Sequence, residues 1–354
     1  GSSAFAGCTS VTELTIPDSV NEMGTLMFNG CTSLETLTIP FAAVKRTCTD
    51  IEGELNVYDS VSDLFIYQWN SWDNYDMDFS DYAIEKIIIT GGETIPSYAF
   101  ANMTTLKEVD LSGTEAISFG DGTFKNCSSL NTIKLPKTIK AAGSYAFYNT
   151  AITALPDNGT IISVGSYAFA ECKKLEKFNI PTTYKSFGDH AFMNCTGIKE
   201  LVIPKNVAVI GTEIFNGCTN LETLTLPYAA AKKSCTDIEG ATGVYDSVAD
   251  LFLYQWNSWN NDNMDFSEYS ISKIIITGGE TVPQYAFSHM TTLREIDMSS
   301  SDIKSISNYA FYNCLSLEKL TLSKSTISLG NYACYNTAIS VLPDNGALAS
   351  VGSY

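Results

Sequence analysis

The sequence predicts a β-rich solenoid of the α/β type, with about 13 stacked coils of 22–24 residues, two insertions and a curved or horseshoe-like shape. Three observations point to this fold class: a repeated Phe-x-x-Cys turn, a short alternating apolar segment in each repeat, and a second period of 187 residues. No single coil can bury its apolar face alone, so neighbouring coils must stack into one continuous core.

Each short repeat carries one residue, here called the anchor, three positions before the Cys of the turn. Consecutive anchors lie 22–24 residues apart, except across two gaps of 72 residues that separate Phe28 from Phe100 and Phe215 from Phe287. Cys334 stands in the eleventh anchor position. The ten aromatic anchors are Phe5, Phe28, Phe100, Phe124, Phe147, Phe169, Phe192, Phe215, Phe287 and Phe311.

The strand of a coil is predicted by segments such as "LETLTI" (34–39), which alternates apolar and polar residues. Leu34, Leu37 and Ile39 form its buried set, and Pro40 ends the strand. Asn is frequent two positions after the anchor, because it tolerates the left-handed backbone of a turn. The coils at Phe147 and Cys334 have a shortened strand segment and should be locally irregular.

The longer period relates two nearly complete copies of one unit. Phe28 maps to Phe215, Trp69 to Trp256 and Tyr145 to Tyr332, each with an offset of 187. We therefore expect one solenoid over 1–354, built from super-repeats at 30–216 and 217–354. Both ends of the sequence fall inside a repeat, so we expect a fragment of a longer protein.

Two insertions, at 41–83 and 228–270, account for the 72-residue gaps. The segment "IEKIIIT" (84–90) aligns with "LETLTIP" (34–40), which predicts a strand directly after the first insertion. Ser60 followed by Asp63 resembles a capping box, and the apolar spacing that follows predicts short helices over 60–69 and 247–256. Neither insertion is large enough to be a domain.

The repeat segments, such as "YAFYNCLSLEKLTLSKSTISLGNYA", resemble the BspA-type leucine-rich repeats over nearly the whole chain. This resemblance implies a leucine-rich-repeat solenoid, a location outside or on the surface of a bacterial cell, and adhesion to host proteins. It implies no catalytic motif and no cofactor. The Cys at anchor position 334 departs from the family's aromatic residue.

The composition excludes several classes of partner. Acidic residues outnumber basic ones by 39 to 21, giving a net charge of −18, so binding to nucleic acid or to an anionic membrane surface is disfavoured. No apolar run reaches the roughly 20 residues of a membrane-spanning helix. The sequence does not define an oligomeric state.

Cysteine and histidine give no catalytic or metal-binding pattern. Seven Cys share one position of the repeat that also accepts Met and Thr, which favours a buried ladder of free thiols, although a disulfide between adjacent coils is sterically conceivable. The state of Cys48 and Cys235, in the insertions, stays open. His190 and His289 are interpreted as substitutions on the coil surface. The acidic stretch 72–81 favours a polar surface loop over a cation site.

All four Trp of the chain lie in "LFIYQWNSW" (64–72) and "LFLYQWNSW" (251–259), and two interpretations remain open for them. In one, Leu64, Phe65, Tyr67 and Trp69 pack the insertion onto the solenoid. In the other, exposed aromatic and amide side chains contact a glycan or a protein. The two interpretations can divide by residue, with Phe65 and Trp69 expected to be buried and Trp72 and Tyr75 expected to be exposed. The candidate ligand-binding residues are Tyr67, Trp69, Trp72, Tyr75, Tyr254, Trp256 and Trp259.

The function expected from these observations is that of a non-enzymatic repeat scaffold that binds a host extracellular protein or a glycan. The alternative is a passive spacer that presents other domains of a larger surface protein. An enzyme is least expected, since the sequence nominates no acid, base or nucleophile in a polar pocket.

Overall fold

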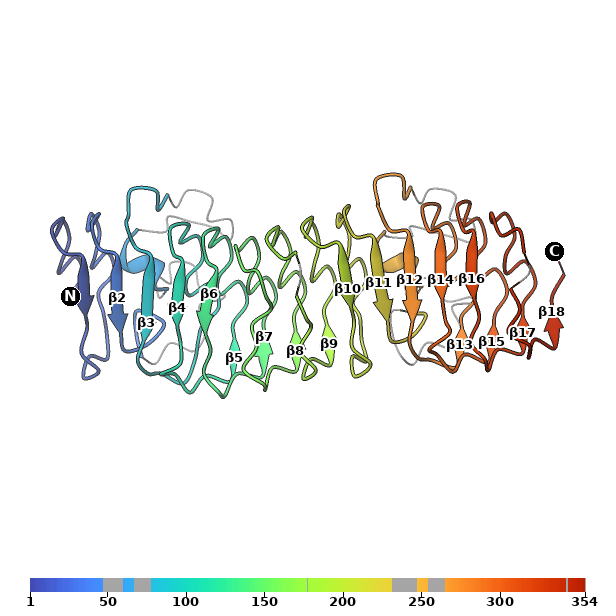
Figure 1. Ribbon diagram of the computed structural model, residues 1–354. Coiled ribbons are helices and arrows are strands. Elements are labelled where there is room, and N and C mark those ends of the chain that lie inside the picture. Colours follow the sequence, from blue (N-terminus) through green and yellow to red (C-terminus); the bar gives the residue numbers. More distant parts are fainter. Residues whose placement is uncertain are drawn as a thin grey trace. The chain divides into compact units, whose positions relative to one another are not determined.

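A computed structural model of the protein describes residues 1–46, 60–66, 78–176, 178–230, 247–253, 265–341 and 343–353. The chain forms two compact units, Gly1–Leu175 (unit 1) and Glu176–Tyr354 (unit 2). Each unit is a parallel β-solenoid of short strands, so the predicted fold class is confirmed (Figure 1). The helices in the described part of the chain are two single 3-10 turns, neither of which has the length or apolar character needed to span a bilayer.

Unit 1 holds one five-stranded parallel sheet and a second row of two-residue strands. In the sheet, Leu37, Ile87 and Val109 pair in register and are fully buried, as the alternation of the segments predicts. The sheet runs in the order β1 (Glu13–Thr15), β2 (Thr36–Ile39), β3 (Lys86–Ile89), β4 (Glu108–Asp110) and β6 (Thr132–Lys134). The second row contains β5 (Ser118–Phe119), β7 (Ala141–Ala142) and β8 (Ser163–Val164).

Unit 2 repeats this arrangement, with Leu224, Ile274 and Ile296 buried in register. Its sheet runs in the order β10 (Glu200–Val202), β11 (Thr223–Leu226), β12 (Lys273–Ile276), β14 (Glu295–Asp297) and β16 (Lys319–Thr321). Its second row contains β13 (Thr281–Val282), β15 (Ser305–Ile306), β17 (Ser328–Leu329) and β18 (Ser350–Val351). The short strand β9 (Ser186–Phe187) forms a parallel bridge to Val209.

The strand predicted directly after the first insertion is confirmed. Thr36 of β2 pairs with Lys86 of β3, so two strands 50 residues apart in the sequence are neighbours in the sheet. Thr223 of β11 and Lys273 of β12 pair in the same way in unit 2. Each insertion therefore leaves and re-enters the solenoid without interrupting the sheet.

The anchors form the centre of the core. Most of them stack on the anchor of the next coil, for example Phe100 on Phe124 and Phe287 on Phe311, with ring centroids 5.2 and 5.4 Å apart. The Cys of the turn lies beside them: Cys127 Sγ donates to the carbonyl of Phe100, the anchor of the preceding coil, at 3.0 Å. The predicted ladder of free thiols is confirmed for the Cys that the structure describes.

The Asn of the turns have the predicted left-handed backbone, with φ of 63° at Asn102 and Asn126 and 55° at Asn149. Their side chains also form an amide ladder, in which Asn126 Nδ2 donates to Asn102 Oδ1 and Asn149 Nδ2 to Asn126 Oδ1. In unit 2, His289 takes the place of the first Asn, and its Nε2 accepts from Asn313 Nδ2 at 3.0 Å. The interpretation of His289 as a surface substitution is therefore wrong: it is 8% exposed, because the ladder buries it.

The coils predicted to be irregular have no strand in their described residues between Asn149 and Pro156 or between Asn336 and Val341. An Asn side chain shapes the bend that replaces the strand. Asn158 Nδ2 donates to the carbonyls of Pro136 and Ile139, and Asn345 does the same to its own preceding coil. Because these coils lack a strand, the sheet of each unit ends at the coil before, at β6 or β16.

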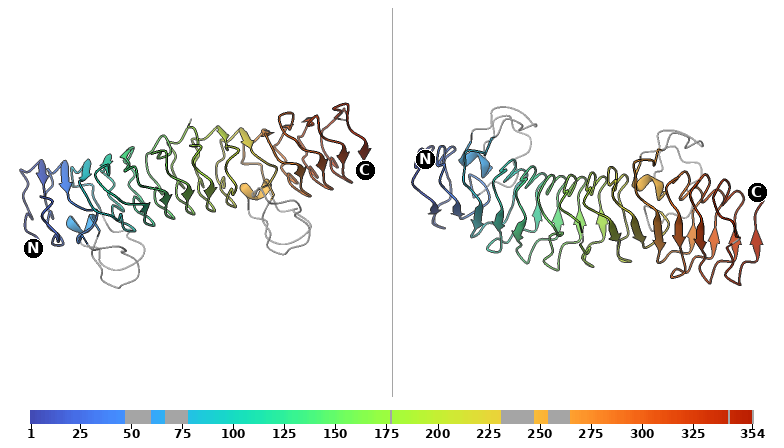
Figure 2. Two further views of the ribbon diagram at one scale, coloured as in Figure 1. Left: turned by 90° about the horizontal axis from the view of Figure 1, so that it is seen from below. Right: turned by 45° about the horizontal axis from the view of Figure 1, so that its top comes forward.

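The predicted helices in the insertions are much shorter than expected. In place of 60–69 and 247–256, the structure has single 3-10 turns η1 (Ser62–Leu64) and η2 (Ala249–Leu251), each set off from the strand row of its own unit (Figure 2). The reason is a competing hydrogen bond: the Asp63 and Leu64 carbonyls accept the N–H groups of Leu26 and Phe28, so they cannot continue a helix. The rest of both predicted helices lies outside the described residues.

Candidate functional site

The predicted capping box at the start of η1 is confirmed. Ser60 N donates to Asp63 Oδ2 at 2.8 Å, and Asp63 N donates to Ser60 Oγ at 3.2 Å. Ser247 and Asp250 make the same reciprocal pair in unit 2. The N–H of Val61 bonds the carbonyl of Ala99 in the next coil. The segment 60–66 therefore lies between two regular coils and is itself part of the solenoid.

Three aromatic residues, here called the insert clamp, hold each insertion at its base: Phe65, Phe79 and Tyr82 in unit 1, and Phe252, Phe266 and Tyr269 in unit 2. Phe65 lies 6.0 Å from Phe79, 5.6 Å from Tyr82 and 5.5 Å from the anchor Phe28, measured between ring centroids. The corresponding distances in unit 2 are 5.9, 5.6 and 5.7 Å. The prediction that Phe65 is buried is confirmed.

A tyrosine hydroxyl joins the clamp to the coil before it. Tyr82 Oη accepts from the N–H of Gly30 at 3.2 Å and donates to the carbonyl of Phe65 at 3.1 Å. In unit 2, Tyr269 makes the same two bonds at 3.1 and 3.2 Å. Burial raises the pKa of Tyr269 above its usual value, so the hydroxyl stays protonated and able to donate.

The residues that the sequence nominates for ligand binding lie outside the described residues. They fall between Ile66 and Asp78 in unit 1 and between Leu253 and Asp265 in unit 2, and include Tyr67, Trp69, Trp72, Tyr75, Tyr254, Trp256 and Trp259. Cys48, Cys235 and most of the acidic stretch 72–81 also lie outside. The described chain on both sides of these segments belongs to the insert clamps, which bring Phe65 within contact of Phe79.

The outward face of the sheet in unit 1 carries a network of ion pairs. Glu108 on β4 bonds Lys86 at 3.2 Å and Lys134 at 2.9 Å, and Lys134 also reaches Asp110 at 3.2 Å. The hydrogen bond from Lys134 lowers the pKa of Glu108 below its usual value. The central charges of this face are therefore satisfied within the protein.

Unit 2 keeps this network, although one of its lysines stands at a different position of its strand. Glu295 bonds Lys273 at 3.2 Å and Lys319 at 2.9 Å. Lys319 occupies the position of Thr132, two residues before the position of Lys134 on the equivalent strand. Side chains two residues apart point to the same face of a strand, so the shifted lysine still reaches the carboxylate. The hydrogen bond from Lys319 lowers the pKa of Glu295.

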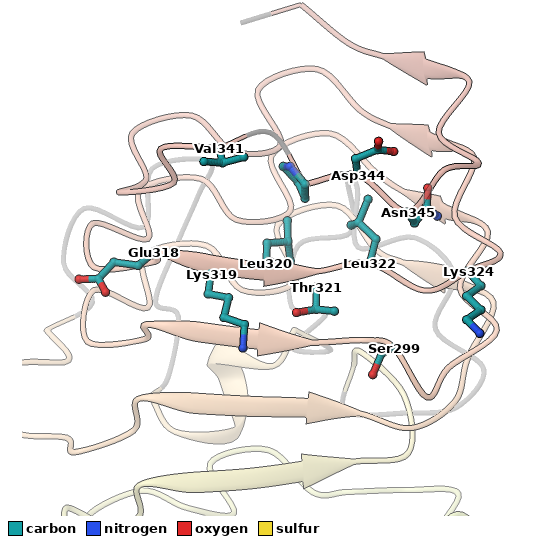
Figure 3. Close-up of a pocket in the computed structure, with 11 residues that line it drawn as sticks. Ser299, Glu318, Lys319, Leu320, Thr321, Leu322, Lys324, Val341, Asp344 and Asn345 are labelled. Atoms are coloured by element: carbon teal, nitrogen blue, oxygen red, sulfur yellow. The ribbon is translucent and has the colours of Figure 1, made fainter.

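A groove of about 540 Å³ lies beside β16, where the sheet of unit 2 ends (Figure 3). Lys319 and Thr321 of the strand line one side, and Val341 and Asp344 of the following irregular coil line the other. Val341 is 77% exposed. The groove exists because the following coil places no strand beside β16, and its lining combines apolar side chains with charges of both signs.

Neither the carboxylates nor the thiols of the described residues form a reactive cluster. Within the parts of the chain that the structure describes, no three His, Cys, Asp or Glu residues come together as a metal site would require. Burial raises the pKa of Cys172 to about 11 and that of Cys218 to about 12. Such thiols hold their protons at neutral pH and are poor nucleophiles.

The insert clamp is not among the features predicted from the sequence. Its signal was present, because Phe79 and Tyr82 recur as Phe266 and Tyr269 at the constant offset of 187. An offset shared by the whole unit does not single out any residue, however. The hydrogen bonds of the tyrosine hydroxyls identify Tyr82 and Tyr269 as parts of the clamp.

Solved structures with the same type of repeat are similar to this chain at low identity. A leucine-rich repeat protein from Bacteroides ovatus is 21% identical, with 95% of this chain and 80% of that chain covered and a TM-score of 0.46. A leucine-rich cell surface protein from Faecalibacterium prausnitzii is 19% identical, with 97% and 79% covered and a TM-score of 0.32. The pneumococcal vaccine antigen PcpA is 18% identical, with 83% and 67% covered and a TM-score of 0.39. No curated protein matches the chain.

The family assignment rests on the repeats themselves. The BspA-type leucine-rich repeat region matches residues 1–51, 93–222 and 262–354 in six copies, which is more than half of the chain. The unmatched stretches, 52–92 and 223–261, contain η1 and η2 and the tryptophan-bearing segments. The chain belongs to the family of BspA-type leucine-rich repeat proteins.

Proposed function

We propose that this chain is a non-enzymatic scaffold, displayed on or secreted from a bacterial cell, that binds a host extracellular protein or a glycan. Surface and secreted proteins are the usual setting of BspA-type repeats, which supports the location. The binding residues we propose are the aromatic residues of the two insertions: Tyr67, Trp69, Trp72, Tyr75, Tyr254, Trp256 and Trp259.

The observation that carries this proposal is the insert clamp. The chain closes on itself at Phe65 and Phe79, which contact each other on either side of the segment 67–77. Ordering a binding segment costs conformational entropy, and holding both of its ends lowers that cost. Phe252 and Phe266 contact each other in the same way on either side of residues 254–264 in unit 2, and the two enclosed sequences are similar.

The lack of an enzymatic role is supported by the chemistry of the described side chains. Glu108 and Glu295 are each bonded to two lysines, and hydrogen bonding lowers the pKa of both carboxyls. The thiols of the core are buried and protonated. A general base or nucleophile needs the opposite tuning, namely a pKa shifted toward neutrality in an accessible site.

A passive spacer remains the second candidate, and the ion pairs on the sheet favour it. Because Glu108 is satisfied by Lys86 and Lys134, the sheet face of unit 1 offers few uncommitted charges to a partner. A spacer would need only the rigid stacking of coils. The two functions differ in what happens when the tryptophans are removed.

The test is an array of immobilised matrix proteins and glycans, probed with the 354-residue chain and with the double variant Trp72→Ala/Trp259→Ala. If the tryptophans bind the ligand, the double variant should lose binding while its unfolding midpoint stays unchanged. A lower midpoint would mean that the tryptophans pack the insertions, and no binding by the unaltered chain would favour the spacer. Ile117→Ala, at an apolar residue that is 65% exposed outside the insertions, is the matched control and should bind normally.

A further inference from the structure

The turns of unit 2 carry five tyrosines in two rows, here called the tyrosine ladder: Tyr285, Tyr309 and Tyr332 in one row, and Tyr312 and Tyr335 in the other. In the first row the rings stack 5.0 Å apart from Tyr285 to Tyr309 and from Tyr309 to Tyr332. In the second row the rings stack at 5.1 Å. Edge contacts between Tyr309 and Tyr312, at 5.6 Å, join the rows.

The backbone under the first row is strained. Tyr285, Tyr309 and Tyr332 have φ between 55° and 57°, the left-handed region in which a bulky side chain is unfavourable. Gly or Asn would fit these positions without strain. Stacking of the rings offsets part of this strain, and the exposed part of a stacked tyrosine combines an apolar ring edge with a hydroxyl that can donate and accept.

Unit 1 interrupts this row, although its fold is the same: it keeps a stacked pair, Tyr145 on Tyr167 with ring centroids 4.7 Å apart, but the ladder does not continue through the coil of Gly122. Gly122 stands where unit 2 has Tyr309, and Lys125 stands where it has Tyr312. The ring of Tyr98 lies where a side chain of residue 122 would be, and Lys125 lies over the ring of Tyr145. The solenoid therefore does not require an unbroken row of tyrosines over three successive coils, and the longer row in unit 2 needs another explanation.

The residues around the ladder indicate which class of ligand suits this surface. Its three turn segments, 284–289, 308–313 and 331–336, contain Tyr, Asn, Gln, Ser, His, Ala, Cys and the buried anchor Phe but no Asp, Glu, Lys or Arg, in a chain of net charge −18. The matching turn of unit 1 carries Asp121 and Lys125. An uncharged surface of tyrosines and amides offers hydrogen bonds and apolar contact to a neutral ligand and no attraction to an anionic one.

We propose that the tyrosine ladder of unit 2 binds a neutral, linear glycan whose sugar units lie along the stacked rings, at a site separate from the insertions and beyond the function proposed for them. An extended peptide repeats its side chains on one face roughly every 6.6 Å, which does not match rings 5.0 Å apart. A chain of linked sugar rings offers the same hydroxyls and C–H edges to each coil in turn. Tyr335, which is 44% exposed, is the most accessible ring of the ladder.

The test is native gel electrophoresis of the 354-residue chain through gels that contain a neutral β-glucan, a neutral mannan or heparin. The variant Tyr309→Gly/Tyr312→Lys gives unit 2 the residues that unit 1 already accommodates. We expect at least one neutral polysaccharide to retard the unaltered chain, heparin to have no effect, and the variant to bind about tenfold more weakly, as the loss of two aromatic contacts predicts. Tyr335→Ala, a milder change at an exposed ring, should weaken retardation in the same gel.

Three outcomes would overturn the ladder as a glycan site. The first is that no neutral polysaccharide retards the unaltered chain. The second is that the double variant is retarded like the unaltered chain. The third applies if the double variant fails to fold, and is that Tyr335→Ala does not weaken retardation. The Trp72→Ala/Trp259→Ala variant separates the two proposals. If it loses retardation while the ladder variants keep it, the insertions bind the glycan and the ladder does not. If it is retarded normally, the ladder acts independently of the insertions.

Discussion

Tyr82 in unit 1 and Tyr269 in unit 2 make the same two hydrogen bonds, whereas Gly122 and Tyr309, at equivalent places on the turns, give their units different surfaces. The first pair lies in the interior, where the hydroxyl bonds a part-buried backbone N–H and a buried carbonyl. The second pair lies on the surface, where the backbone accepts either residue. The two units thus share the groups that hold them together and differ in what they present to a partner.

The sheet face shows how far a surface can change without loss of its interactions. The lysine that bonds the central carboxylate is Lys134 in unit 1 and Lys319 in unit 2, at positions two residues apart on equivalent strands. The pairing persists because both positions point outward. On the turns no such compensation occurs, since Lys125 is replaced by the uncharged Tyr312. The turns are therefore the region where the units differ in chemistry.

The largest effect is expected from breaking the insert clamp. Phe65→Ala removes a fully buried ring at the centre of the clamp and should lower the free energy of unfolding by about 3–5 kcal/mol. Phe252→Ala should cost about the same in unit 2. Denaturant unfolding of both variants measures the loss. A cost below about 1 kcal/mol in either unit would mean that the clamp is not part of the core.

A smaller loss is expected from the clamp hydroxyl alone. Tyr82→Phe keeps the ring but leaves the N–H of Gly30 without the bond that it makes at 3.2 Å, and should cost about 1–3 kcal/mol. Tyr269→Phe is the matched change. The same denaturant titration tests both, and unequal costs would show that the clamps differ in strength despite their equal geometry.

The buried thiols predict a loss of stability at alkaline pH. Burial raises the pKa of Cys172 from 9.0 to about 11, so above pH 9 the unfolded chain releases a proton that the folded chain retains. The stability contributed by the protonated thiol should therefore be fully present below pH 9. The free energy of unfolding should then fall as the pH rises toward 11. Unfolding midpoints measured from pH 8 to 11 test this, with Cys172→Ala as the control whose decline should be shallower. An identical pH dependence of the two proteins would contradict it.

The smallest effect is expected on the sheet face. Glu108→Gln removes a carboxylate bonded to two lysines in a partly exposed site, and should cost about 0.5–1 kcal/mol. Glu295→Gln should behave alike, because its two partners lie at the same distances. The loss should shrink in high salt, which screens exposed charges. A loss that salt does not change would point to packing instead of charge.

Much of the fold could be predicted from the sequence, because the period and the strand register are kept in most coils. Leu37 and Val109 alternate with polar neighbours, and the left-handed turn at Asn126 suits its residue type. The participation of segment 60–66 in the solenoid could not be predicted. Phe65 lies 37 residues after one anchor and 35 before the next, so no repeat spacing identifies it. Backbone bonds to the coils on both sides, from Leu26 and Phe28 and to Ala99, place the segment there.

The candidate site was predictable to a lesser degree. Trp69 and Trp72 were nominated by composition, and they lie outside the described residues. The tyrosine ladder could not be predicted from the sequence, because Tyr309 and Tyr312 look like ordinary turn residues of the repeat. The ladder is identified by ring stacking between coils and by the contrast with Gly122 and Lys125 in unit 1. A single repeat contains neither of these signals.

Binding by the single tryptophan variants tests most directly the claim that two like units display recognition segments on one scaffold. Surface plasmon resonance on a densely immobilised ligand from the array would compare the unaltered chain with Trp72→Ala, Trp259→Ala and the double variant. The account predicts that each single variant binds through its remaining segment, weaker by about 10²-fold or more through lost avidity, and that the double variant does not bind. Equal binding by all four proteins, at equal unfolding midpoints, would contradict it.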